Sequence, residues 1–149
     1  MTALAVRVDA FTACGAAFVV AGGLVGAVTG PLDLAKGSWL AAYLVLVCGV
    51  ALIVIGAAQQ RLDAPVPAQL QVLQLTGWLV ANVVVVLGSL SSSTVIVDVG
   101  AVLLLIVLAT TWWIGRTLAR RRTLAAYAYL AILAILIVSA PVGMGLAAH

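Results

Sequence analysis

The sequence RTLARRR at residues 116–122 contains four of the chain's seven basic residues: Arg116, Arg120, Arg121 and Arg122. Apolar runs of membrane-spanning length flank it on both sides. Arg and Lys in short loops beside membrane spans stay on the cytoplasmic side. This basic loop therefore predicts the orientation of the whole chain. It also attracts anionic lipid, by about 1 kcal/mol per residue, or else docks a cytosolic partner.

The composition places the chain among integral membrane proteins. Of its 149 residues, 66% are hydrophobic and 7% are charged, and the mean hydropathy is +1.32. Soluble domains carry about 25% charged residues, so these few charges cannot cover a water-facing surface. The net charge of +3 needs no nucleic-acid partner, because the basic excess is concentrated in residues 116–122.

Apolar runs of about 20 residues each match the thickness of a bilayer. They predict an all-α, polytopic helical bundle that forms a single transmembrane domain over residues 1–149. Five spans are expected, with four as the alternative. The predicted spans are 10–30, 38–56, 68–90, 94–115 and 124–146.

The distribution of basic residues predicts the topology. With five spans and residues 116–122 inside, six basic residues are cytoplasmic and only Lys36 is external. That bias follows the positive-inside rule. We therefore expect a plasma-membrane protein with a cytoplasmic N-terminus and an external C-terminus.

Glycines form a stripe in the first predicted span. Gly22, Gly26 and Gly30 recur every four residues, which places them on one helix face. Small residues at this spacing let two helix backbones approach closely in a membrane. The stripe packs either against another helix of the chain or against a partner or second copy.

The span at 68–90 is the most polar. Gln71, Gln74, Trp78, Asn82 and Ser89 follow helical spacing. Polar groups in hydrocarbon need partners, so this face should point toward other helices. The candidate functional residues Gln71, Gln74 and Asn82 serve either interhelical hydrogen bonding or a polar lining for a substrate or water path.

Asp98 is the one acidic residue inside a predicted span. Intramembrane carboxylates are costly, and many are functional. Asp98 lies about 6 Å past Thr94, at about 1.5 Å per residue. Three interpretations remain open: a structural role, as a helix-start cap or an ion-pair partner of Lys36; a proton or cation site; or an inter-subunit contact.

Motifs for catalysis, metals and cofactors are missing from the sequence. The single histidine is the last residue, His149, and Cys14 and Cys48 are interpreted as small apolar fillers. The four Asp residues are scattered, and neither a P-loop nor a dinucleotide fingerprint occurs. We therefore expect no enzyme activity, no metal site and no cofactor.

One segment carries a family resemblance. GSWLAAYLVLV at residues 37–47 is similar to a run in uncharacterised actinobacterial multi-pass membrane proteins. The resemblance covers one span and implies no activity.

Two functions remain open on the sequence. The first is a small non-catalytic structural or accessory subunit, packed in the lipid bilayer against a larger membrane complex or against itself as a homo-oligomer. The alternative is a small oligomeric transporter or channel that uses the polar face of residues 68–90 together with Asp98.

Overall fold

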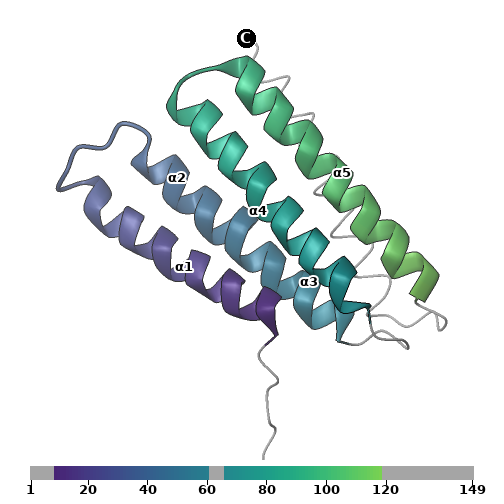
Figure 1. Cartoon of the computed structure of the whole chain (residues 1–149). Coiled ribbons are helices and arrows are strands. Elements are labelled where there is room, and N and C mark those ends of the chain that lie inside the picture. The colour runs from purple at the N-terminus through teal and green to yellow at the C-terminus, as the bar shows by residue number, and fades with distance from the viewer. Residues whose placement is uncertain (1–8, 61–65, 119–149) are drawn as a thin grey trace, which may run out of the picture. The chain divides into compact units, whose positions relative to one another are not determined.

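The computed structural model describes residues 9–60 and 66–118, and these residues are helical apart from their connections (Figure 1). Four helical segments are long and apolar enough to cross a membrane: Ala10–Thr29, Gly37–Gln59, Ala68–Leu90 and Thr94–Ile114. The all-α class is therefore confirmed, and the four-span alternative matches the described part of the chain. The fifth predicted span, 124–146, lies outside the described residues.

The described helices lie close to the predicted spans, and two of them, α3 (Ala51–Gln59) and α5 (Thr94–Leu118), continue past the predicted ends. Helix α1 is Ala10–Thr29 and α4 is Ala68–Leu90. Helix α5 therefore continues past the predicted end of its span, and Arg116 is helical where a loop was expected. Nothing between Thr94 and Leu118 breaks a helix, since this stretch contains no proline.

The second span changes its hydrogen-bonding pattern along its length. It consists of α2 (Gly37–Tyr43), a π-helical segment η1 (Leu44–Val50) and α3 (Ala51–Gln59). At the end of η1, the backbone N–H of Ala51 bonds to the carbonyl of Leu46, five residues back. A π-helical turn inside an α-helix is rare, and the sequence did not predict it.

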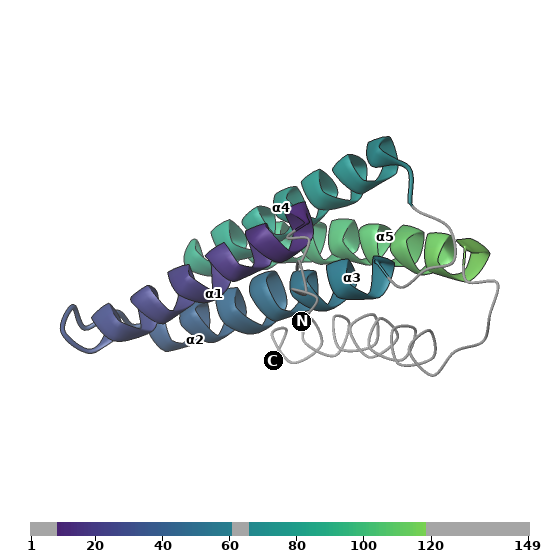
Figure 2. The ribbon, with the colours of Figure 1, turned by 90° about the horizontal axis from the view of Figure 1, so that it is seen from below.

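The described residues up to Ala57 form one compact unit. Here α1 runs antiparallel to α2 and η1 and lies beside them in both ribbon views (Figures 1 and 2). Glycines set the close approach of these helices. A Cβ atom placed on Gly15 would lie 2.7 Å from the carbonyl oxygen of Gly49, and one on Gly22 would lie 2.9 Å from that of Ala41.

The described residues from Ala58 onward belong to the second unit, in which α4 and α5 pack antiparallel. A Cβ atom on Gly88 would lie 2.6 Å from the backbone nitrogen of Val97. Another on Gly100 would lie 2.7 Å from the backbone nitrogen of Val85. These contacts fix the register of the two helices.

The α1–α2 and α4–α5 connections begin with the same helix-ending motif. Asp33 and Ser92 have φ of 46° and 56°, in the left-handed region. The N–H of Leu34 bonds to the carbonyl of Thr29, and the N–H of Ser93 bonds to that of Gly88. These bonds back to a carbonyl five residues earlier satisfy helix-end acceptors in the Schellman arrangement.

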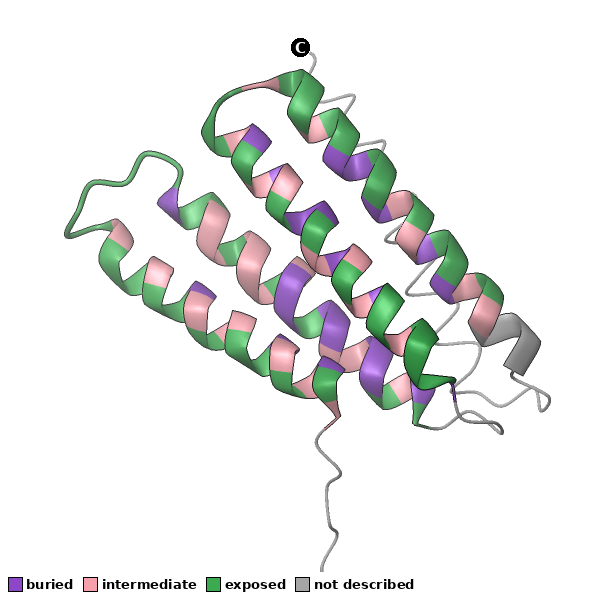
Figure 3. Ribbon diagram, viewed as in Figure 1, coloured by how far each residue is buried: buried purple, intermediate pink, exposed green. Residues whose placement is uncertain are grey.

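Buried, intermediate and exposed residues are interspersed in the described helices (Figure 3). Large aliphatic side chains such as Leu24, Leu46, Leu73 and Val95 are exposed. Such exposure suits contact with lipid and would be unfavourable in water. The described part of the chain is therefore a membrane-embedded protein.

A buried polar stripe as the candidate functional site

The polar face of α4 is buried. Gln74, Trp78 and Asn82 have exposed fractions of only 5%, 2% and 3%. They lie four residues apart and therefore on one helix face. We call these three residues the buried polar stripe. Val85, the next step along the same face, is buried and apolar, so the stripe ends there.

Hydrogen bonds satisfy part of this stripe. Gln59 at the end of α3 donates through Nε2 to Oε1 of Gln74, at 2.9 Å in a buried position. Asn82 donates through Nδ2 to the backbone carbonyl of Trp78 at 2.8 Å. The first bond connects two separate helices, and the second folds the Asn82 amide back onto its own helix.

Gln71 lies apart from the stripe. It is half-buried, and its Nε2 donates to the carbonyl oxygen of Val66 at 3.2 Å. Gln71 thus stabilises the first turn of α4, whose cap is Pro67. The structure therefore separates Gln71 from the deeper Gln74 and Asn82, with which the sequence had grouped it.

Two buried N–H donors find no acceptor among the described residues. They are Nε2 of Gln74 and Nε1 of Trp78. An unsatisfied buried donor costs about 1–3 kcal/mol, and each group that stays unpaired in the bilayer core costs several. In the described part of the stripe, these two nitrogens are therefore the polar atoms whose burial costs the most free energy.

Thr111 supplies a polar group on α5. It is 3% exposed, and its hydroxyl donates to the carbonyl oxygen of Val107 at 2.7 Å. A Cβ atom on Gly77 would lie 2.9 Å from Val107, so continuing the antiparallel register places Thr111 about level with Gln74. Neither Gln59 nor Thr111 was predicted as a site residue from the sequence. Gln59 was assigned to a loop, and a threonine in an apolar run gives no distinctive signal.

The predicted glycine stripe is only partly a packing face. Gly22 is buried at a close helix approach, but Gly26 and Gly30 are exposed. A Cβ atom on Gly26 would meet Ala41 at an ordinary 3.6 Å, and one on Gly30 would meet nothing within 4 Å. The glycines of α1 that pack closely against the second span are Gly15 and Gly22, which lie seven residues apart.

Asp98 lies outside the stripe. It is exposed on α5, whereas Ala101, Leu104 and Leu108 form the buried face of that helix. Within the described part of its own unit, the Asp98 carboxylate has no hydrogen-bond or ion-pair partner. No described residue of that unit makes Asp98 a helix-start cap, and the ion pair with Lys36 stays a prediction.

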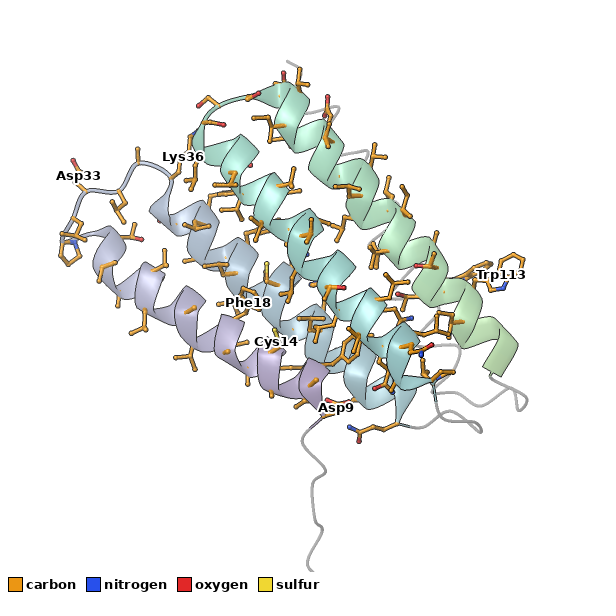
Figure 4. All side chains as sticks on the ribbon, viewed as in Figure 1. Asp9, Cys14, Phe18, Asp33, Lys36 and Trp113 are labelled. Carbon is orange, nitrogen blue, oxygen red and sulfur yellow. The ribbon has the colours of Figure 1, made fainter. Side chains whose placement is uncertain are left out.

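The remaining predicted residues lie toward the ends of the spans. Figure 4 shows Asp33 and Lys36 at the loop between α1 and α2, and Trp113 projecting from α5 near its end. Trp39 and Tyr43 stack with ring centroids 5.2 Å apart. Arg120, Arg121 and Arg122 lie outside the described residues.

The functional groups of the buried polar stripe and of Thr111 are neutral amides, an indole and a hydroxyl. Among residues 9–60 and 66–118, no three His, Cys, Asp or Glu side chains come together in a way that could hold a metal ion. No protein-family model matches the chain, and no curated protein or solved structure is detectably similar to it.

Proposed function

We propose that this chain is a non-catalytic membrane subunit that packs against the helices of another membrane protein. The observation that carries the proposal is an open small-residue face on α1. Among the described residues, Gly23 and Gly30 meet no atom within 4 Å of where a Cβ would be. Ala16 and Ala27 are exposed on the same helix face.

An open glycine face is costly if it meets only lipid. Each glycine in a helix interior costs about 1 kcal/mol relative to alanine. Gly15 and Gly22 offset this cost by admitting the second span, whereas no described helix approaches Gly23 in this way. A helix of another protein that packs closely at these open positions would offset the cost in the same way, because small residues promote helix association in membranes.

The proposed location is the plasma membrane, with the N-terminus and the α3–α4 connection in the cytoplasm. Six of the seven basic residues would then be cytoplasmic, as the positive-inside rule requires. The α1–α2 and α4–α5 connections would face the outside.

Purification in mild detergent tests the proposal. The wild-type chain should co-purify with a larger membrane protein at fixed stoichiometry. The double variant Gly23→Leu, Ala27→Leu should remain folded and lose that partner. Ala109→Leu is the matched control, since it adds a similar side chain at an exposed position on α5 and should retain the partner.

A transporter or channel built from several copies is the second candidate, and the burial of two amide side chains in α4 favours it. Asp98, however, does not share the face of α5 that is buried with Ala101 and Leu104. A lone homo-oligomer whose flux in reconstituted vesicles is lost in Asn82→Leu would replace our proposal with this one.

A further inference from the structure

A carboxylate lies on an exposed valine face of α5. Val95, Val99 and Val102 are 70%, 51% and 50% exposed, and Asp98 is exposed among them. The four residues stand at positions i, i+3, i+4 and i+7 and therefore share one face of the helix. We call these four residues the acidic valine face. It occupies the first turns of α5, next to the α4–α5 connection.

Asp98 has no counter-charge along its own helix. Side chains three and four positions away are the ones that a helical residue can reach. At these positions α5 has only uncharged residues, namely Thr94, Val95, Ala101 and Val102. The first basic residue of α5, Arg116, lies 18 residues after Asp98, or about 27 Å along the axis. The charge of Asp98 is therefore not compensated within α5.

An uncompensated carboxylate in a membrane span is unfavourable. Asp98 lies about 6 Å past Thr94 along the helix axis. Its side chain has a single methylene group, which gives it a shorter reach toward water than the long side chains of Lys and Arg. Charged groups inside membranes are typically found facing other helices and paired with an opposite charge. A cation supplied from outside α5 would remove the cost of the Asp98 charge.

The valines around Asp98 favour another helix as the source of that cation. Spacing at i, i+3, i+4 and i+7 is the pattern by which one helix contacts a partner. Valine has one strongly preferred rotamer in a helix, so packing against these side chains costs little conformational entropy. A second copy of the chain docked through the same face would bring two Asp98 carboxylates together, and like charges at close range are unfavourable.

We propose that the acidic valine face docks a transmembrane helix of another membrane protein, and that this helix carries Lys or Arg at the depth of Asp98. The valines pack against apolar side chains of that helix, and the Asp98 carboxylate pairs with its cation. The inference rests on the proposed function, because it supposes a partner in the membrane, but it concerns α5 and names the partner's chemistry. Ala109 lies about 16 Å beyond Asp98 along the axis and outside this contact.

Co-purification of charge variants tests the inference. The tagged chain is purified in mild detergent from membranes of its native host, and the partner is identified by mass spectrometry. Asp98→Asn should lower the amount of retained partner at least about tenfold, because one member of a shielded charge pair is removed. Asp98→Glu keeps the charge and should keep the partner.

Asp33→Asn is the matched control. It removes the same charge from an exposed residue of the α1–α2 connection, and asparagine tolerates the left-handed conformation that Asp33 adopts. This variant should retain the partner. Equal losses in Asp33→Asn and Asp98→Asn would show an effect of net charge and would overturn the inference.

Charge reversal identifies the cation. Asp98→Lys should lose the partner, and an acidic replacement of the partner's Lys or Arg at that depth should restore the complex. A partner without such a residue contradicts the inference. A pair within this chain would give another result: Lys36→Gln would lose the partner as fully as Asp98→Asn, and Asp98→Lys combined with Lys36→Asp would restore it. That result would also overturn the inference.

Photo-crosslinking locates the contact in intact membranes, before detergent is added. A photoreactive residue at Val102 should crosslink to the partner. The same residue at Val83, which is 54% exposed on α4, is the control and should not. Equal crosslinking from the two positions would mean that the partner does not select the acidic valine face.

The failures of this inference and of the proposed function are distinguishable. If no larger protein co-purifies with the wild-type chain, both are wrong. If the wild type and Asp98→Asn retain a partner equally, the proposed function stands and the inference is wrong. If Asp98→Asn instead loses only bound phosphatidylethanolamine, measured by lipid mass spectrometry, the cation is a lipid ammonium group and the inference is again wrong.

Discussion

Gly15 and Gly49 form a reciprocal backbone contact between α1 and η1. A Cβ atom on Gly15 would lie 2.7 Å from the carbonyl oxygen of Gly49, and one on Gly49 would lie 3.0 Å from that of Gly15. Neither contact can be relieved by turning a side chain, because both oxygens belong to the backbone. This pair therefore sets the distance between the two helices.

Gly15→Ala should destabilise the protein by about 1–3 kcal/mol, the usual cost of overpacking. Gly23→Ala is the control on the same helix. A Cβ atom there meets nothing within 4 Å, so the higher helix propensity of alanine should stabilise by up to about 1 kcal/mol. Reversible unfolding in mixed detergent micelles measures both, and equal signs would disprove the assigned packing.

Gly22→Ala should be more harmful than Gly26→Ala. A Cβ atom on Gly22 would lie 2.6 Å from a methyl carbon of Val45 and 2.9 Å from the Ala41 oxygen, whereas one on Gly26 would be at an ordinary contact distance. We expect a loss of about 1–3 kcal/mol for the first and little change for the second. Thermal denaturation in detergent can rank the two variants, and the reverse order would contradict the register of α1.

Ser92→Gly should stabilise the α4–α5 connection. Ser92 has φ of 56°, and non-glycine residues pay about 1–2 kcal/mol for the left-handed conformation. Ser91 is the matched control, because its φ is −81° and glycine there relieves no such cost. Midpoints of detergent-induced unfolding should rise for Ser92→Gly only; a rise in both variants would indicate a different cause.

Asp98→Asn should change stability by no more than a few tenths of a kcal/mol, because surface charges without a close partner contribute little. Asp9→Ala provides the contrast. Asp9 accepts a 2.7 Å bond from the Thr12 N–H at the start of α1, and losing such a cap costs about 0.5–2 kcal/mol. Unfolding free energies test both variants, and a large loss for Asp98→Asn would reveal a partner outside the described residues.

Thiol labelling should place Asp33 and Ser92 on one side of the membrane and Gln60 on the other. Each is replaced singly by Cys in a Cys14→Ala, Cys48→Ala background. A membrane-impermeant maleimide added to intact cells should label positions 33 and 92, and position 60 should react only after permeabilisation. Labelling of position 60 in intact cells would reverse the proposed orientation.

The sequence predicted the described spans well, because composition alone separates membrane helices from their connections. Helix α4 starts directly after Pro67, a residue that cannot continue a preceding helix. The spacing of Gln74, Trp78 and Asn82 identified the polar face of α4. These features depend on local chemistry, which a single sequence contains.

Features that depend on helix partners were not predictable in the same way. Gly22 and Gly26 have equivalent spacing in the sequence, yet only Gly22 meets the backbone of the second span. The contact between Gln59 and Gln74 joins residues on two helices, and no periodicity within either helix indicates it. Likewise, the position of Asp98 in the sequence did not predict that it would lie on the exposed side of α5.

The π-helical segment gives the second span a tolerance for changes in chain length. A π-helical hydrogen bond joins residues five apart, whereas an α-helical one joins residues four apart. The segment η1 therefore contains one residue more than an α-helix needs to cover the same turn. Deleting Leu46, whose side chain is exposed, would let this segment close as an α-helix. Tyr43 and Ala51 would keep their faces, whereas a deletion inside α1 would rotate every later residue of that helix by about 100°, the angle of one residue at 3.6 per turn.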